Sequence, residues 1–285
     1  MFTGFDKFNF DVAGVQIRGV RGGTGRPLLL LHGFPQTHVM WHAVAPRLAE
    51  EFTIIASDLR GYGGSGKPPT TPDHMPYTKR AMADDQARLM TLLGYERFSV
   101  AGHDRGGRCA YRLALDHPQR VERLAVLDVV PTADALAGMN AQLAHSLWRW
   151  FFLAQPAPLP ETLITADPEA FYFGAHAEVF EPAALAAYRR AVSDPATVHA
   201  MCEDYRAMVG LDIEHDEADR VAGYRITAPL LTMWGTRSHL HRHYNVLDVW
   251  RSWANDVRGQ ALDCGHFLPE ECPVETAEGL AAFFR

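Results

Sequence analysis

Gly102-His103-Asp104-Arg105-Gly106 is the stretch of the chain that decides the fold. It follows an apolar run, residues 98–102, that predicts a buried strand, and it precedes residues 107–115, which predict a helix. A strand, a tight turn and a helix with this glycine spacing form a nucleophile elbow, in which aspartate here replaces the usual serine. A carboxylate that attacks carbon forms an alkyl ester with the protein, so we expect the electrophile to be a saturated carbon bearing a leaving group, or an epoxide. In the alternative interpretation, Asp104 only caps the helix.

The rest of the chain places this turn within an alternation of strands and helices. The apolar pattern predicts buried strands at residues 27–31, 52–56, 121–130 and 229–235, a further strand at 260–263, an antiparallel pair within 10–20, and helices at 78–93 and 274–284. Such alternation predicts an α/β protein with a mostly parallel sheet and helices on both faces. Residues 131–228 carry many aromatic side chains within helical segments. We interpret them as a helical cap inserted into a core of residues 1–130 and 229–285.

Composition excludes several classes of protein. The 285 residues are 47% apolar, which is enough for one sizeable core with a smaller appended lobe. The formal net charge of −7 argues against general nucleic-acid binding. No apolar stretch approaches the ~20 residues of a membrane span, and the N-terminus lacks the pattern of a signal peptide. The four cysteines form no C-x-x-C pair, so we expect reduced thiols and a cytoplasmic protein.

A general base and an acid partner complete the predicted catalytic set. Gly265-His266 lies near the C-terminus, where the chain order nucleophile, acid, histidine puts the histidine. The loop after the strand at 229–235 contains no carboxylate before Asp248, whereas Asp128 follows an apolar strand directly. We therefore predict that Asp128 orients His266 and that His266 activates the water that releases the ester. The alternative for Asp128 is an ordinary cap of a turn.

Backbone N–H groups are the predicted stabilisers of the negative charge that develops on the ester oxygen. Arg105, directly after the nucleophile, offers one N–H, and Phe34, just after the Leu-rich strand at 27–31, offers the second. Residues 32–35 also fit an ordinary tight turn at a strand end. Both interpretations of this turn can hold together.

Two arginines beside Asp104 predict an anionic substrate. Arg105 follows Asp104 directly, and Arg108 lies four positions after it, the spacing of one helix face. Together with the positive N-terminus of the helix, the two guanidinium groups predict a site for a carboxylate whose α-carbon then faces Asp104. The same charges favour the ionised form of Asp104. In the alternative interpretation, both arginines pair with acids at the surface.

A leaving anion needs hydrogen-bond donors on the wall opposite Asp104, and the cap is the part of the chain left to provide them. Trp148 and Trp150 are two positions apart, so they project from different sides of a helix and only one can face the pocket. An indole N–H is a suitable halide donor, which makes Trp150 a candidate. The alternative is that Trp150 is a core residue.

Taken together, residues 102–108 and 128–132 resemble the fluoroacetate and haloacetate dehalogenases of the α/β-hydrolase superfamily. The resemblance covers nearly the whole chain and includes residues 32–36, 58–65, 152–158, 204–206 and 265–267. It implies an α/β-hydrolase fold and the hydrolysis of haloacetates to glycolate. In this family, Asp104 displaces halide with inversion, His266 and Asp128 hydrolyse the resulting ester, and Arg105 and Arg108 hold the substrate carboxylate.

The resemblance also implies a halide pocket, and here the chain departs from the family. Trp150 and Tyr205 match two of the family's three halide donors. Members that handle fluoride carry a histidine in a Trp-His-Trp run, where this chain has Trp148-Arg149-Trp150. Departing fluoride needs several short hydrogen bonds, so we expect chloro- and bromoacetate to be hydrolysed more readily than fluoroacetate. Arg149 itself, or His145 one helical turn earlier, is the candidate third donor.

Three other functions remain open from the sequence. An epoxide hydrolase uses the same aspartate and histidine, with cap tyrosines as acids, but a neutral epoxide has no use for the cation at Arg105. Haloalkane dehalogenation is disfavoured for the same reason. A protein that binds a small acid without converting it is the third alternative.

Metal and cofactor motifs are weak in this chain. His239, His241 and His243 alternate without a nearby set of acids or cysteines, which indicates a solvated loop rather than a metal site. Residues 61–66 are rich in glycine but lead into Lys67-Pro68-Pro69 instead of a helix, so they do not form a phosphate-binding loop. We expect no metal and no cofactor, a small anionic molecule as the binding partner, and, from the family resemblance, a homodimer.

Overall fold

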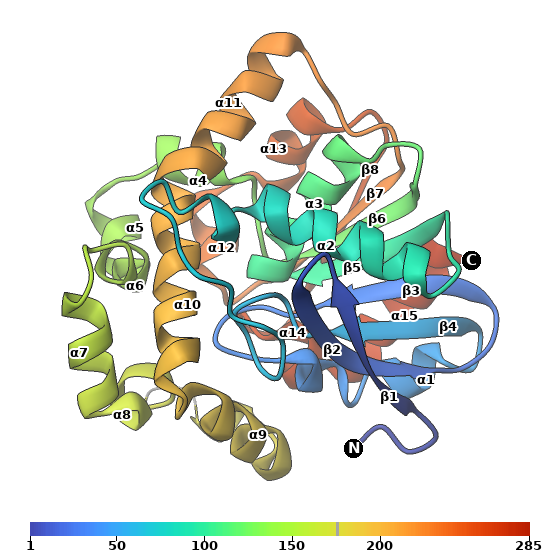
Figure 1. The fold of residues 1–285 in the computed structure, drawn as a ribbon. Coiled ribbons are helices and arrows are strands. Elements are labelled where there is room, and N and C mark those ends of the chain that lie inside the picture. The colour runs from blue at the N-terminus through green and yellow to red at the C-terminus, as the bar shows by residue number, and fades with distance from the viewer. Residues whose placement is uncertain (175–176) are drawn as a thin grey trace.

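The computed structural model describes residues 1–174 and 177–285, and its strands form one eight-stranded sheet in the order β1-β2-β4-β3-β5-β6-β7-β8 (Figure 1). Residues 175 and 176, inside the predicted cap, lie outside the described part. The strands are β1 (Asp6–Val12), β2 (Val15–Gly22), β3 (Arg26–Leu31), β4 (Phe52–Ser57), β5 (Phe98–His103), β6 (Val121–Leu127), β7 (Leu230–Gly235) and β8 (Val257–Leu262).

The sheet is mostly parallel, as predicted. β1 pairs with β2 and β2 with β4 in antiparallel fashion, whereas β4, β3, β5, β6, β7 and β8 pair in parallel. Every residue of β4 and β5 is buried, which explains why these strands are continuous apolar runs rather than alternating ones. In a parallel sheet the carboxyl ends of neighbouring strands lie at one edge, so the residues after β5 and β6 become neighbours.

Helices cover both faces of the sheet. α2 (Lys79–Leu92) and α3 (Arg105–Asp116) lie in front of it in Figure 1, and α1 (Ala45–Leu48) contacts α15 (Pro273–Phe284) behind it. Tyr111 of α3 packs with ring centroids 5.7 Å and 6.2 Å from Trp250 and Trp253, which puts α13 (Val246–Trp253) on the face of α3. The remaining short helices of this part are η1 (His38–Trp41), η2 (Met75–Tyr77), α12 (His239–His243) and α14 (Leu268–Glu271).

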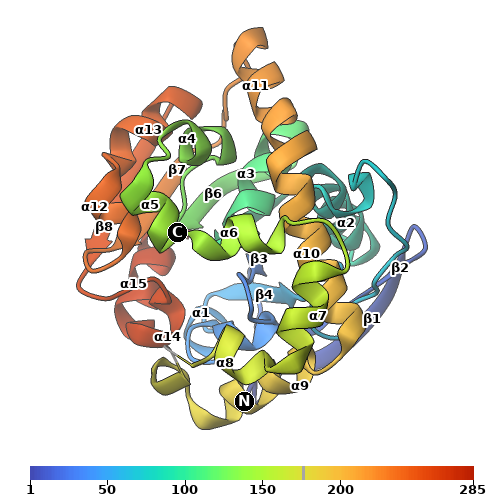
Figure 2. The same cartoon turned by 90° about the vertical axis from the view of Figure 1, so that its left-hand side faces the viewer.

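The segment between β6 and β7 is helical, and Figure 2 shows it crossing in front of the sheet. Its elements are α4 (Thr132–Ala137), α5 (Ala141–Ser146), α6 (Trp148–Leu153), α7 (Leu159–Ala166), α8 (Pro168–Tyr172), η3 (Ala177–Val179), α9 (Pro182–Val192), α10 (Pro195–Ala207), η4 (Met208–Asp212) and α11 (Ile213–Ala222). The division into a core of 1–130 and 229–285 and a cap of 131–228 stays our proposal.

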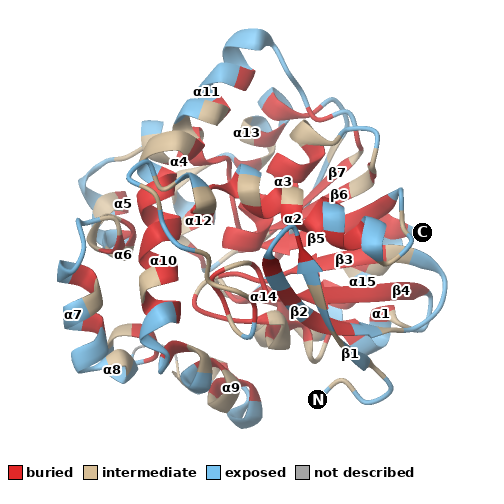
Figure 3. Cartoon of the chain, viewed as in Figure 1, coloured by how far each residue is buried: buried red, intermediate tan, exposed pale blue. Residues whose placement is uncertain are grey.

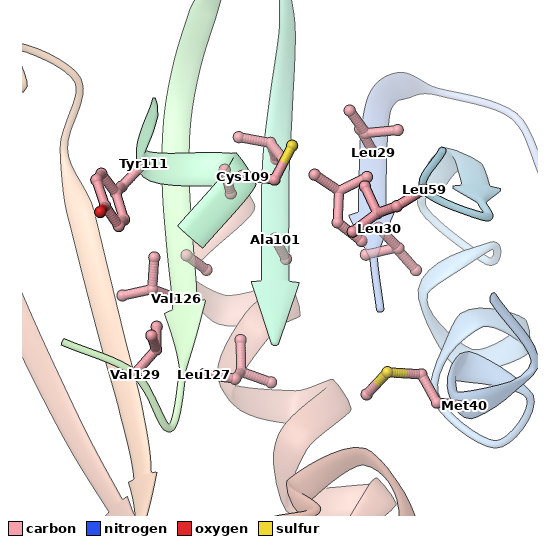
Figure 4. Close-up of a cluster of buried hydrophobic side chains, with 14 of the residues drawn as sticks. Leu29, Leu30, Met40, Leu59, Ala101, Cys109, Tyr111, Val126, Leu127 and Val129 are labelled. Carbon is pink, nitrogen blue, oxygen red and sulfur yellow. The ribbon is translucent and has the colours of Figure 1, made fainter. Parts of the chain in front are cut away.

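The core of the protein lies on the two faces of the sheet. Figure 3 shows buried residues along the central strands and exposed ones on the outer sides of α7, α9 and α11. Leu29 and Leu30 of β3, Ala101 of β5 and Val126 of β6 belong to this buried cluster, and Cys109 of α3 packs on them (Figure 4). Within the described residues, no helix is long and apolar enough to span a membrane.

One predicted strand is longer than the strand in the structure. We predicted a strand over residues 121–130, but β6 ends at Leu127. Asp128 adopts a φ of 49°, a left-handed conformation that breaks the strand. This break turns the Asp128 side chain out of the sheet at its carboxyl edge, where the functional site is built.

Candidate active site

The turn between β5 and α3 is a strained elbow that exposes one carboxylate. Asp104 has φ 49° and ψ −114°, a conformation that residues with a side chain rarely adopt. A Cβ on Gly102 would lie 2.3 Å from the carbonyl oxygen of Gly106, and a Cβ on Gly106 would lie 2.4 Å from that of His32. Both glycines of the motif are therefore required for the close approach of strand and helix.

The Asp104 side chain does not cap the helix that follows it. Its side chain forms no hydrogen bond to the first turn of α3, so the capping interpretation is wrong. Instead, Oδ1 accepts from the backbone N–H of Phe34 at 2.8 Å. Burial raises the pKa of Asp104, but the charge of His266 and the Phe34 N–H outweigh it, and the pKa lies below its usual value. The carboxylate is thus ionised at neutral pH, with Oδ2 left to react.

His266 and Asp128 form a tight pair next to this carboxylate. Nδ1 of His266 donates to Oδ2 of Asp128 at 2.6 Å. The other oxygen of Asp128 accepts from the N–H of Gly235 at 3.1 Å and from Oγ of Ser238 at 2.8 Å. The loop after β7 therefore contributes donors to Asp128, and sequence reasoning missed Ser238.

The second imidazole nitrogen of His266 faces the Asp104 carboxylate. Nε2 lies 3.9 Å from Oδ2 of Asp104, too far for a direct hydrogen bond. In neutral His266, the proton on Nδ1 is shared with Asp128, which leaves the lone pair on Nε2 to accept a proton from water. Burial lowers the pKa of His266, but the hydrogen bond to Asp128 and its charge raise it by more, so the net pKa lies above its usual value.

Glu271 holds the loop that carries His266, and no sequence pattern pointed to this residue. Its two carboxylate oxygens accept from the N–H of Gly265 at 2.6 Å and from the N–H of Phe267 at 2.9 Å. These are the residues on either side of His266. One carboxylate on α14 thus fixes the backbone at both flanks of the proposed base.

Two further histidines flank His266. The ring of His103 lies 4.7 Å from that of His266, and its Nε2 hydrogen-bonds the His266 carbonyl oxygen at 2.8 Å. The ring of His239 lies 5.9 Å away on the other side. Burial and the charge of His266 lower the pKa of both side chains to about 4. Both imidazoles are therefore neutral at physiological pH and add no charge next to His266.

A cavity of about 390 Å³ lies above these residues, between the sheet edge and the cap. Asp104, Asp128 and His266 form its floor, and the opposite wall comes from α6, α8 and α10. Trp150 lines the cavity and is 8% exposed, while Trp148 points outward and is 44% exposed. The structure thus places one tryptophan of the pair at the site, as the two-residue spacing required.

Of the two arginines that follow Asp104, Arg108 lines the cavity. Its Nη1 donates to the carbonyl oxygen of Val130 at 3.0 Å and to Oγ1 of Thr132 at 2.9 Å, and its guanidinium carbon lies 4.8 Å from the Trp150 ring centroid. Its Nε is buried and has no hydrogen-bond partner among the described residues. The guanidinium group of Arg108 thus brings a permanent positive charge to the edge of the cavity that Asp104 also lines.

The structure does not bring the Arg105 side chain to the cavity wall, where its predicted role in holding the substrate would need it. Its guanidinium is fully buried, outside the cavity wall, and binds Asp204 of α10 through Nε at 2.9 Å and through Nη2. Nη1 contacts Sδ of Met208 at 3.1 Å. Three helical positions turn a side chain about 60° from its neighbour, and the buried Asp204 carboxylate draws Arg105 to that side. Arg105 instead connects α3 to α10 through this ion pair. Its guanidinium carbon lies 4.3 Å from the centroid of the Tyr205 ring.

Of the two candidates for the third halide donor, Arg149 lies at the cavity and His145 does not. Arg149 lines the cavity, although its Nε and Nη2 donate to the carbonyl oxygen of Phe171 at 3.2 Å and 3.1 Å. His145 is wrong as a donor, because it is exposed and lies outside the cavity wall. It sits near the end of α5, and the chain leaves that helix before Trp148 begins α6, so one-turn spacing does not carry across. Tyr205 is 2% exposed and lines the cavity.

The three alternating histidines lie on a short helix, α12, rather than in a loop. His239 lines the cavity, and Nε1 of Trp234 donates to Nδ1 of His241 at 3.1 Å. Among the described residues, no group of three or more potential ligands is placed to hold a metal ion.

Comparison with known proteins agrees with this architecture. The family model described as "alpha/beta hydrolase fold" matches residues 26–273. The chain therefore belongs to the α/β-hydrolase superfamily and is a hydrolase of that fold.

Relatives narrow the assignment within that superfamily. The chain is 46% identical to a fluoroacetate dehalogenase from Burkholderia sp over 290 residues, which cover 99% of this chain and 95% of that protein. This similarity places it in the dehalogenase family that its motifs indicated. It is also 34% identical to a soluble epoxide hydrolase from Corynebacterium sp. (strain C12), over 96% of this chain and 95% of that one. The crystal structure of ALR0039 from Nostoc sp PCC 7120 superposes with a TM-score of 0.97 at 50% identity, covering 100% and 99% of the two chains.

Proposed function

We propose that the protein hydrolyses haloacetates to glycolate through a covalent ester on Asp104. One observation carries the proposal: an ionised carboxylate on a strained elbow shares a cavity with Arg108, a permanent cation. The pair fits a substrate that is both an electrophile and an anion. A halide on the α-carbon of a short carboxylic acid meets both requirements.

In the first step, Arg108 binds the substrate carboxylate and presents the α-carbon to Oδ2 of Asp104. The oxygen attacks in line with the carbon–halogen bond, so the new C–O bond forms as halide leaves with the bonding electrons. Phe34 holds the other oxygen, Oδ1, which becomes the ester carbonyl oxygen. The fixed N–H therefore sets which oxygen attacks.

In the second step, water attacks the ester carbonyl carbon of Asp104. Nε2 of His266 takes the proton from this water, and Asp128 stabilises the imidazolium that forms. Negative charge develops on Oδ1, where the N–H of Phe34 already donates, and we assign the N–H of Arg105 as its second donor. When the tetrahedral intermediate collapses, the bond between the carboxyl carbon and the substrate oxygen breaks, and that oxygen takes the proton from His266. Glycolate is released, and the Asp104 carboxylate and neutral His266 are restored.

We assign Trp150, Tyr205 and Arg149 to the halide side of the cavity. Arg149 occupies the place of the family's histidine, but two of its nitrogens are committed to Phe171. A long cation held in this way suits a large halide better than fluoride, which needs short hydrogen bonds as it departs. We therefore propose chloro- and bromoacetate as better substrates than fluoroacetate.

Halide release from fluoro-, chloro- and bromoacetate tests this function. We expect chloride and bromide to be released with a kcat/KM at least tenfold above that for fluoride. A protein that releases fluoride fastest contradicts the assignment of Arg149, while no release from any of the three contradicts the dehalogenase function itself.

Epoxide hydrolysis is the second candidate, and one feature of the cap favours it. Tyr172 and Tyr205 both line the cavity, and the buried Tyr172 hydroxyl has no hydrogen-bond partner among the described residues. Two tyrosines can protonate the oxygen of an opening epoxide. Arg108 argues against it, because a neutral epoxide leaves that buried cation unmatched. Diol formation from a simple epoxide, without halide release from haloacetates, would reverse our preference.

A further inference from the structure

Two cysteines bracket the loop that carries His266. Cys264 lies two residues before His266, and Cys272 lies six residues after it. Their Sγ atoms are 2.8 Å apart. Cys264 is buried, whereas Cys272 is partly exposed. The two sulfur atoms thus bring the ends of a loop into contact, and this loop contains the proposed catalytic base.

The backbone on both sides of this contact is already fixed. Glu271 binds the N–H groups of Gly265 and Phe267, so the cysteines are the next residues outward on each side of that clamp. The Cys264 carbonyl accepts from the N–H of Arg237 at 3.0 Å, and the N–H of Cys272 donates to Leu268 at 3.0 Å. A bond between the two sulfurs therefore needs little movement of the main chain.

The surroundings make Cys272 the reactive partner. It is the N-cap residue of α15, where the partial positive charge of a 12-residue helix favours a thiolate. The hydrogen bond with Cys264 lowers the pKa of the Cys272 thiol by more than burial raises it. Its partial exposure lets a small oxidant reach it, while Cys109 and Cys202 are buried away from solvent.

We propose that Cys264 and Cys272 are a reversible disulfide site that locks the His266 loop. With hydrogen peroxide as oxidant, the Cys272 thiolate attacks one peroxide oxygen, the O–O bond breaks, and sulfenic acid and hydroxide form; the hydroxide takes a proton to become water. The Cys264 sulfur then attacks the Cys272 sulfur, the S–O bond breaks, and the hydroxyl leaves as water with the Cys264 proton. Two thiols are oxidised by two electrons and one peroxide is reduced to two waters. A dithiol reverses the step.

The locked loop should stabilise the folded state. The disulfide closes a ring of nine residues, 264–272, which removes freedom from the unfolded chain. For a protein of this size we expect the Tm to rise by about 5 °C on oxidation and to return on reduction. This expectation is independent of which substrate the cavity accepts.

Peptide mapping of the full-length native protein tests the site directly. Residues 259–285 form one tryptic peptide, since Arg258 and Arg285 bound it and no lysine or arginine lies inside. The protein is exposed to hydrogen peroxide, its free thiols are blocked with an alkylating agent, and it is digested with trypsin and then with a glutamate-specific protease, which cuts after Glu270 and Glu271. We expect the two fragments that contain Cys264 and Cys272 to stay joined without reductant and to separate with it.

Matched variants separate this site from general oxidation. Cys272→Ser should abolish the joined fragments and the Tm rise, whereas Cys202→Ser, which removes a remote thiol, should keep both. In Cys264→Ser we expect a sulfenic acid at Cys272 that a dimedone probe captures. Two alkylated cysteines after peroxide treatment of the unmodified protein, or sulfinic acid without joined fragments, would overturn the proposal.

Discussion

The two walls of the cavity were predictable to very different degrees. On the sheet side, Asp104, Asp128 and His266 meet as their places at strand ends required. On the cap side, Trp150 and Tyr205 line the cavity, but His145 lies outside and Arg105 turns away to Asp204. The sheet side is set by backbone hydrogen bonds, whereas the cap side depends on how short helices pack.

Backbone register explains the success at the sheet. The N–H of Asp104 donates to the carbonyl of Leu127 at 3.2 Å, and that of Asp128 donates to Met233 at 2.8 Å. These backbone hydrogen bonds place the residue at the end of one strand next to the end of the neighbouring strand. The order of the strands and the elbow motif therefore define how Asp104 and Asp128 lie relative to each other.

Helix packing explains the failures at the cap. Spacing along one helix says which residues share a face, but α5 ends before α6 begins, and the sequence does not mark that break. The buried pair of Arg105 and Asp204 joins positions 99 apart in sequence, so its pattern is not readable from either neighbourhood. Glu271 and Ser238 were missed for a similar reason, since Glu271 bonds the loop that carries His266 and Ser238 bonds Asp128, both through tertiary contacts.

The largest predicted effect is on the sheet side. His266→Asn removes the base while leaving Asp104 free to react, so turnover should fall by about 10²–10⁴-fold. Intact mass after exposure to chloroacetate should rise by one carboxymethyl group. The adduct should map to the tryptic peptide of residues 98–105, whose single side-chain carboxylate is Asp104. An unmodified peptide would remove Asp104 from the mechanism.

The next effect tests whether the anion site lies at Arg108. Arg108→Met deletes the donor next to the nucleophile, and a charged hydrogen bond is worth about 1.5–3 kcal/mol, so kcat/KM for chloroacetate should fall by roughly 10–100-fold, mainly through KM. Arg149→Met, on the opposite wall, is the matched control and should affect KM less. Equal losses of affinity in both variants would mean that the two walls share the carboxylate.

The pH dependence separates the two chemical steps. Asp104 has a lowered pKa and stays ionised, whereas His266 has a raised pKa and must be neutral to act as base. As pH falls below the His266 pKa, ester hydrolysis should slow about tenfold per unit while alkylation continues. Rapid-quench mass spectrometry should then show ester accumulating on the acid side. Accumulation on the alkaline side would reverse the assigned roles.

A smaller effect sharpens the account of the cap. Arg149→His restores the family's histidine and releases the Phe171 carbonyl. One added short hydrogen bond to departing fluoride is worth about 1.4 kcal/mol, so the ratio of fluoride to chloride release should rise about tenfold. An unchanged ratio would show that position 149 does not contact the halide.

The smallest effect concerns the loop clamp. Glu271→Gln keeps the size of the side chain but replaces one acceptor with an amide N–H, so one flank of His266 loses its hydrogen bond. We expect kcat to fall by about 5–10-fold, with KM nearly unchanged. Glu270→Gln is the control, because that carboxylate bonds Gln36 and Tyr188 instead of the loop. Matching losses in the two variants would point to general destabilisation.

A single turnover in water enriched in oxygen-18 tests the central claim most directly. If Asp104 forms an ester that water opens at the carbonyl carbon, the label enters the peptide of residues 98–105, and the first glycolate released is unlabelled. If water attacks the substrate carbon itself, the label appears in glycolate and the peptide keeps its natural mass, which would contradict the covalent mechanism.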